Sequence, residues 1–232
     1  MNPPMKQLLT LLLTISTSFL FSQKKYEFDY LIEFKQTYYK NSKSENTISG
    51  FYLTNSKKNN YVALVTSLDS TNYKMHFKDE NGLSFNVNFK KSDLEKAEFI
   101  NVNCYYVSNY NNPYKVRIEE YDFFNLNDTI IDETEYSRYK LTSTIPRREK
   151  KKKLGTEFYI IDNNTKFHLP LLYFSTAYEE WKSKKNIPNG IFKERHLVDY
   201  YGKLFIREKT IGYRKINKTI IIDEECDYTR NK

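Results

Sequence analysis

Apolar and polar side chains alternate in the segment that begins at Tyr26. The apolar face of this segment carries Tyr26, Phe28, Tyr30, Ile32 and Phe34. Charged residues fill most of the positions between them, and Leu31 is an apolar interruption of the pattern. A repeat of two residues is typical of a half-buried β-strand, whereas a helix repeats every 3.6 residues. We therefore predict a strand over residues 25–38.

The same alternation recurs on both sides of a turn at Asn81-Gly82. The apolar residues of its two arms are Tyr73, Met75 and Phe77, then Leu83, Phe85, Val87 and Phe89. Asn-Gly supplies the positive φ angles that a tight hairpin needs. The other predicted strands are 47–54, 60–67, 99–107, 114–124, 134–143, 156–162, 191–198, 203–213 and 216–225. In total this makes about twelve strands, whose short connections favour antiparallel pairing.

Helix signals are confined to two short segments. Residues 175–185 have capping-box spacing from Thr176 to Glu179, and an aromatic stripe that ends at Trp181. A single helical turn is predicted near 93–98. Aromatic residues make up 16% of the chain, and their rings would supply most of the core area. The sequence thus predicts a mainly β protein: a curved antiparallel sheet, either an unclosed barrel or a sandwich, with one or two short helices packed on it.

Residues 1–22 have the layout of a secretory signal peptide. Lys6 precedes an apolar run that ends at Phe21, and Ser22 provides a small residue for cleavage. The run is shorter than the roughly 20 apolar residues that a membrane-spanning helix needs. We therefore expect cleavage near Ser22 and export to the periplasm, the outer-membrane surface or the extracellular space. The remaining residues, 23–232, are expected to form a single β-rich domain.

The sequence contains two cysteines, Cys104 and Cys226. In an exported protein an even number of cysteines favours a disulfide, so we expect these two to be bonded. The alternative is a pair of buried thiols. The three histidines are scattered without the spacing of metal ligands, and no metal site is expected.

Residues 146–154 are the most basic part of a chain whose net charge is +8. In a cytosolic protein such a run would suggest a nucleic-acid partner, but export argues against that partner. We interpret the run as an exposed loop between two strands, with contact to anionic lipid headgroups or acidic polysaccharide as the alternative. The run also separates 24–145 from 155–232. The second part alone would have a poor core, which favours one continuous sheet.

The sequence carries no recognisable catalytic or cofactor-binding motif, whether nucleophile elbow, zinc-protease motif, phosphate-binding loop or dinucleotide fingerprint. The tightest acidic group is Glu119, Glu120 and Asp122, where Glu120 and Asp122 would share a face if the segment is a strand. Alternating acids of this kind usually form the solvated face of a strand. We therefore expect a non-enzymatic protein without a cofactor, and keep a secreted hydrolase using carboxylates as an alternative.

This order of features resembles the small exported envelope proteins of LolA/LolB-like type. The resemblance rests on the signal peptide, the amphipathic aromatic strand at 26–34, the hairpin at 75–89 and the late helix. It implies a curved, unclosed sheet whose concave apolar face is covered by helices and accepts acyl chains. This chain departs from that layout in having only one strongly signalled helix, and no binding residue is carried over by motif.

The one-sided aromatic strands and the signal peptide suggest an exported envelope protein that binds an apolar ligand, such as a lipid or the acyl chain of a lipoprotein. The residues expected to line its concave face are Tyr30, Ile32, Phe34, Phe77, Phe85 and Val87, with Trp181 from the covering helix. Core packing is the alternative role of each. A surface adhesin or carbohydrate-binding module, using exposed tyrosines and a basic face on acidic glycans, is the second class. The sequence does not indicate an oligomeric state.

Overall fold

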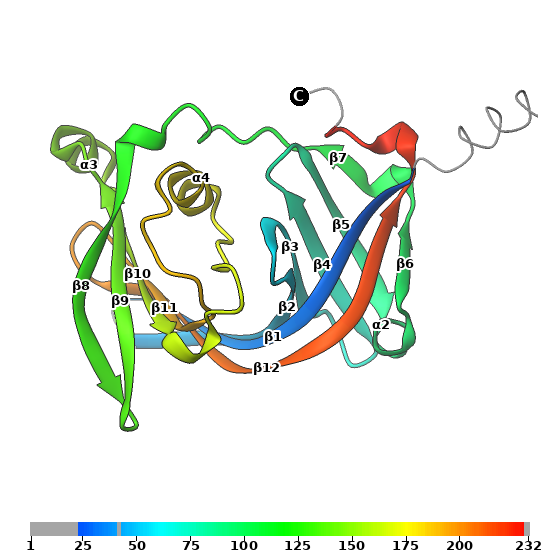
Figure 1. The fold of residues 1–232 in the computed structure, drawn as a ribbon, viewed down its shortest axis with the longest axis horizontal. Coiled ribbons are helices and arrows are strands. Elements are labelled where there is room, and N and C mark those ends of the chain that lie inside the picture. The colour runs from blue at the N-terminus through cyan, green and yellow to red at the C-terminus, as the bar shows by residue number, and fades with distance from the viewer. Residues whose placement is uncertain (1–22, 41–42, 230–232) are drawn as a thin grey trace, which may run out of the picture.

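The computed structural model describes residues 23–40 and 43–229, which form one continuous twelve-stranded sheet and three short α-helices (Figure 1). The sheet is curved and not closed, so the predicted fold class is confirmed. The predicted signal peptide, residues 1–22, lies outside the described residues. Within the described residues, no helix has both the length and the apolar character that a membrane crossing requires.

The elements follow one another with short connections. The first strands are β1 (Lys24–Lys40), β2 (Lys43–Asn55), β3 (Lys58–Ser67), β4 (Asn72–Asp79), β5 (Leu83–Lys90), β6 (Phe99–Val102) and β7 (Val107–Asn109). The later strands are β8 (Tyr121–Ile131), β9 (Thr134–Ser143), β10 (Thr156–Asp162), β11 (Phe192–Val198) and β12 (Leu204–Ile222). The helices are α2 (Lys91–Lys96), α3 (Pro146–Lys152) and α4 (Ser175–Lys184), with single 3-10 turns η1 (Cys104–Tyr106), η2 (Ile118–Glu120), η3 (Asn163–Thr165) and η4 (Glu224–Cys226).

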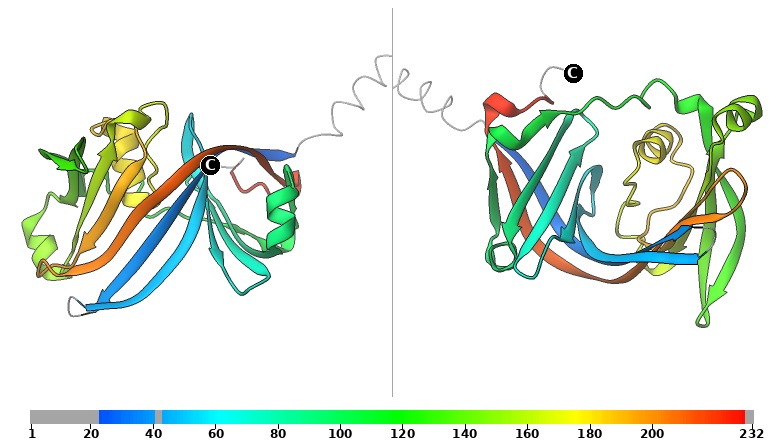
Figure 2. Two further views of the ribbon diagram at one scale, coloured as in Figure 1. Left: turned by 90° about the horizontal axis from the view of Figure 1, so that it is seen from below. Right: turned by 180° about the vertical axis from the view of Figure 1, so that it is seen from behind.

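The sheet forks at its longest strand. Its order is β7-β5-β4-β3-β2-β1-β12-β11-β10-β9-β8, and these neighbours are antiparallel. β1 and β12 form the long central pair that bends across the molecule (Figures 1 and 2). The other edge of β12 pairs first with β11, along residues 204–209, and then in parallel with β6, along residues 219–222. One half of the sheet therefore contains β2–β7 and the other contains β8–β11.

Four of the predicted strands differ from the structure. The sequence predicts two separate strands over residues 203–213 and 216–225, but most of these residues belong to the single strand β12. β12 stays continuous because two register shifts against β1 accommodate its bending. The expected strand 99–107 is divided by η1, and the expected strand 114–124 contains η2 before β8 begins. Both interruptions are single turns without an apolar stripe, which the periodic pattern does not reveal.

Residues 146–152 form α3 where the sequence predicted a loop. Pro146 occupies the first turn of α3. Proline is favoured there, because the backbone N–H groups of the first turn have no partner within the helix. Lys153 ends the helix with a φ of 49°. None of the α3 residues is buried, so the segment has no apolar face that could have signalled a helix.

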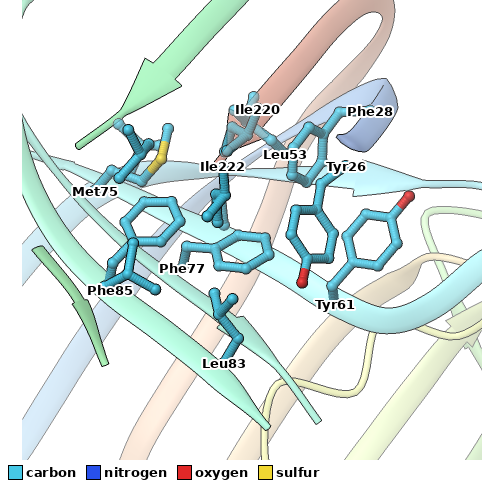
Figure 3. Close-up of a cluster of buried hydrophobic side chains, with 14 of the residues drawn as sticks. Tyr26, Phe28, Leu53, Tyr61, Met75, Phe77, Leu83, Phe85, Ile220 and Ile222 are labelled. Atoms are coloured by element: carbon cyan, nitrogen blue, oxygen red, sulfur yellow. The ribbon is translucent and has the colours of Figure 1, made fainter. Parts of the chain in front are cut away.

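The main core cluster fills the half of the sheet that contains β2–β7 (Figure 3). The rings of Phe77 and Phe85 stack with their centroids 4.7 Å apart, and the ring of Tyr26 lies 4.6 Å from Phe77. The Tyr26 hydroxyl donates a hydrogen bond of 2.9 Å to Asp79, which satisfies this buried polar group. Aromatic packing between facing strands therefore holds this half together.

β1 changes the face that it buries partway along its length. Tyr26 and Phe28 belong to the main core cluster, and the next β1 residue in that cluster is Leu31. A register shift against β12 precedes Leu31, as expected for a bulge that interrupts the strict alternation of faces. Ile32 and Phe34 consequently belong to a different cluster.

The segment between β10 and β11, which includes α4, lies across the hollow of the curved sheet (Figure 1). Lys78 on β4 binds this segment: its Nζ donates to the carbonyl of Tyr173 at 2.6 Å and to Oγ of Ser175 at 3.1 Å. Glu80 neutralises the buried ammonium at 2.7 Å. Because a buried cation requires such partners, these bonds tie the covering segment to the opposite half of the sheet.

Candidate ligand-binding groove

An open groove of about 710 Å³ lies between α2 and strands β1, β2 and β12. Its volume falls within the range of about 300–1,000 Å³ that is usual for small-molecule sites. The apolar residues that line it are Leu31, Phe34, Phe51, Tyr73, Leu94 and Ile211. The charged residues that line it are Glu33, Lys91, Glu95, Arg214 and Lys218. An apolar floor with charged groups around it is suited to a ligand that has both an apolar and a polar part.

Gly50 on β2 shapes one wall of the groove. A Cβ atom at this position would lie 2.4 Å from the carbonyl oxygen of Val65 and 2.9 Å from Cζ of Phe34. Backbone cannot yield to contacts that short, so the absence of a side chain lets β3 and the Phe34 ring approach β2. Phe34 itself is buried, and its ring contributes to the wall rather than projecting into solvent.

The opposite side of the groove is formed by α2, which tertiary contacts hold in place. A helix of six residues has little stability of its own. Leu94 inserts into the main core cluster, and Nζ of Lys218 on β12 donates to the carbonyls of Leu94 and Ala97. Burial lowers the pKa of Lys218, and the nearby positive charge of Arg214 lowers it further. These contacts fix α2 against the sheet.

The residues that the sequence assigned to a ligand-binding face lie in several places. Phe34 lines the groove, whereas Phe77 and Phe85 are interior residues of the main core cluster and Val87 packs at its edge. Tyr30 contacts the rings of Phe167 and Tyr213, Ile32 packs beside Ile191, and Trp181 lies in the cluster under α4. The groove residues that the sequence did not single out come mainly from α2 and β12. Only Leu31 had a visible signal, as the interruption of the β1 pattern.

A buried charge network lies where β10, β11 and β12 meet the covering segment. Nη1 of Arg195 is 3.3 Å from Glu157, and Nη2 is 3.0 Å from Glu208. The Tyr52 hydroxyl donates to Glu208 at 2.9 Å, and the guanidinium of Arg195 lies over the ring of Phe174. One cation thus faces two carboxylates in a buried place. Burial raises the pKa of Glu157, although the charge of Arg195 opposes this effect.

The raised pKa of Glu157 predicts a pH dependence of stability. A group whose pKa is higher in the folded state than in the unfolded state stabilises the fold fully at pH values below its unfolded-state pKa. It loses that contribution as the pH rises through its folded-state pKa. Replacing Glu157→Gln should therefore raise the free energy of unfolding relative to wild type more at pH 7 than at pH 4. Urea unfolding at a series of pH values measures the difference.

An exposed acid provides the control for this experiment. Glu119→Gln should give a nearly constant difference from wild type across the same pH series, because Glu119 is exposed. A flat profile for Glu157→Gln as well would mean that the buried carboxylate does not take up a proton on folding.

The acidic group considered for catalysis does not form a carboxylate pair across a cleft. Glu119 and Glu120 lie in η2 rather than in a strand, which changes the faces that they occupy. Glu120 pairs with Arg148, and Asp122 pairs with Lys184 at 3.2 Å. In residues 23–40 and 43–229, no cluster of three or more His, Cys, Asp or Glu side chains has an arrangement that could hold a metal ion.

A disulfide joins Cys104 in η1 to Cys226 in η4, as the sequence predicted. η1 lies between β6 and β7, and η4 follows the end of β12. The bond therefore fastens η4, which follows β12, to the β6–β7 connection, beside the parallel pair of β6 and β12. Disulfides persist in oxidising compartments, so this bond agrees with export.

Neither a protein-family model nor a curated protein matches this sequence. Solved structures that are similar include MucB, with 9% identity, a TM-score of 0.39 and coverage of 82% of this chain and 54% of that one. The MucA/MucB complex of Pseudomonas aeruginosa matches with 6% identity, a TM-score of 0.40 and coverage of 82% and 52%. The chain thus spans about half the length of the MucB chains that it matches.

A domain assigned to outer membrane lipoprotein sorting, from Vibrio parahaemolyticus, is also similar. It shows 9% identity and a TM-score of 0.30, with coverage of 81% of this chain and 85% of that one. A DUF1329 family protein from Desulfovibrio piger has 12% identity and a TM-score of 0.30, with coverage of 88% and 90%.

Proposed function

We propose that this is an exported, non-enzymatic protein of the cell envelope that binds an acyl chain, as part of a lipid or a lipoprotein, in the groove between α2 and strands β1, β2 and β12. The observation that carries the proposal is the groove itself. Its volume of about 710 Å³ suits a small ligand, and its floor combines aliphatic and aromatic side chains from separate elements.

The way the groove is built also supports binding rather than simple core packing. Leu31 and Leu94 are buried in the floor, yet Ile211 remains 63% exposed at the groove. An apolar side chain that is both exposed and part of a hollow offers surface that a ligand would remove from water. Burial of such surface contributes roughly 25 cal/mol per Å², so an acyl chain that covers it gains affinity.

Blocking the groove provides the main test. Ser49 is exposed and lines the groove, so Ser49→Trp would place an indole in the space that a ligand needs. Binding of the apolar fluorescent probe N-phenyl-1-naphthylamine, and its displacement by dodecanol, should weaken at least about tenfold, equivalent to about 1.4 kcal/mol. The melting temperature should stay close to that of the wild-type protein, because no core residue changes.

Ser44→Trp is the matched control. Ser44 is an exposed residue of the same strand and lies outside the groove lining, so its replacement should leave probe binding unchanged. The proposal is wrong if wild-type protein does not bind the probe, or if Ser49→Trp binds it as well as Ser44→Trp does. If the probe experiments support the groove, mass spectrometry of organic extracts from natively purified protein would identify the natural ligand.

A further inference from the structure

The charged residues of the groove are not equally engaged. Nζ of Lys218 donates hydrogen bonds to the carbonyls of Leu94 and Ala97, and Nζ of Lys91 donates to Oγ of Ser67 at 2.8 Å. Arg214 differs from both, because it lines the groove without an ion pair to any carboxylate among the described residues. Its guanidinium is therefore available to a ligand.

Arg214 also differs from Arg207 and Lys209, two other cations of β12. Arg207 and Lys209 both pair with Glu194, at 2.8 Å and 3.8 Å. Arg214 instead acts on Lys218: burial lowers the pKa of Lys218 most, and the positive charge of Arg214 lowers it further. Glu98 and Glu95 also act on Lys218, but each has a smaller effect on its pKa than Arg214 has, and neither cation forms an ion pair with a carboxylate among the described residues. An anion bound between Arg214 and Lys218 would relieve their repulsion.

We infer that the groove recognises amphiphiles with an acidic headgroup, a carboxylate or a phosphate, and that Arg214 binds this headgroup while the acyl chain lies on the apolar floor. The inference rests on the proposed function. Arg214 lies opposite Leu31 in the β1–β12 ladder, so a headgroup at Arg214 places the chain next to a buried part of the floor. Guanidinium groups bind both kinds of oxyanion through paired hydrogen bonds.

The groove also contains the acids Glu33 and Glu95, which would oppose an anion. Both acids are exposed, as is Arg214, so water screens all three charges, whereas Lys218 is partly buried. The three cations exceed the two acids in number, and Arg214 and Lys218 of β12 both line the groove. A positively charged headgroup would be repelled by Arg214 and Lys218. A cationic amphiphile therefore serves as the negative control.

The test compares four ligands with the same chain: dodecanoate, dodecyl phosphate, dodecanol and dodecyltrimethylammonium. The displacement of N-phenyl-1-naphthylamine from the purified protein is measured for each ligand. We expect at least one acidic ligand to bind about tenfold more tightly than dodecanol, as a charge-assisted hydrogen bond gives. Arg214→Met should remove this preference and leave dodecanol binding unchanged. The relative strength of the two acids then distinguishes a carboxylate from a phosphate headgroup.

Lys215→Met is the matched control, because Lys215 is an exposed neighbour that does not line the groove. It removes the same net charge and should preserve the preference for acids. Equal binding of dodecanol and both acids by wild-type protein would overturn the inference and leave the proposed function standing. Tighter binding of the trimethylammonium ligand, or an equal loss in Lys215→Met, would also overturn it. Failure of every ligand to displace the probe would count against the proposed function instead.

Discussion

Replacing Cys104 and Cys226 together by alanine is expected to lower the free energy of unfolding by about 5 kcal/mol. The disulfide joins residues separated by 122 positions, and removing a crosslink of that span enlarges the unfolded ensemble. The folded state also loses the bond between η1 and η4, which fastens the end of β12 to the β6–β7 connection. Urea unfolding of oxidised wild-type and double-variant proteins, followed by circular dichroism, measures the loss.

The same experiment has an internal control. Wild-type protein under reducing conditions should unfold at the urea concentration found for the double variant, and Cys104→Ala alone should behave like the double variant. If reduction leaves the unfolding midpoint of wild-type protein unchanged, the crosslink does not contribute through the entropy of the unfolded chain.

Arg195→Met is expected to cost about 3–5 kcal/mol, because it leaves two buried carboxylates without their cation. Glu157 and Glu208 would then repel each other, and Glu208 would retain only its hydrogen bond from Tyr52. Destabilisation should grow as the pH rises, because burial raises the pKa of Glu157 and the variant lacks the cation that faces the ionised form of Glu157. Urea unfolding of wild-type and variant proteins at several pH values measures both effects.

Two further variants separate charge from packing at this network. The triple variant Arg195→Met/Glu157→Gln/Glu208→Gln removes all three charges and should recover part of the lost stability. The exposed Arg147→Met should change stability by less than about 0.5 kcal/mol. A loss as large in the triple variant as in Arg195→Met would show that the guanidinium acts through its packing on Phe174 rather than through its charge.

Local elements of the fold were predictable because their signals lie in neighbouring residues. The predicted strands 134–143 and 156–162 coincide with β9 and β10, and α4 begins at the predicted residue, Ser175. The pairing of β1 with β12 was not predictable in this way. Its partners are far apart in the sequence, as in Tyr26 with Ile220, and no local pattern encodes their register.

The groove was harder to predict for a related reason. Its lining combines Leu31, Leu94 and Arg214, which only the folded sheet brings together. Alternation identifies two faces of a strand but does not say which of them borders a hollow. In β1 the two faces also exchange roles at a register shift, so an extrapolation from Tyr26 along the even positions leads into another cluster.

The pairing of β1 with β12 also places the two ends of the described chain side by side. Nζ of Lys24 donates to Oγ1 of Thr229 at 3.0 Å, so a short linker could join these ends into a circle. The hairpin turn at Asp132 and Glu133, where both residues have positive φ, offers a place to open that circle without removing a strand. A circular permutant beginning at β9 would keep every strand beside its present neighbours.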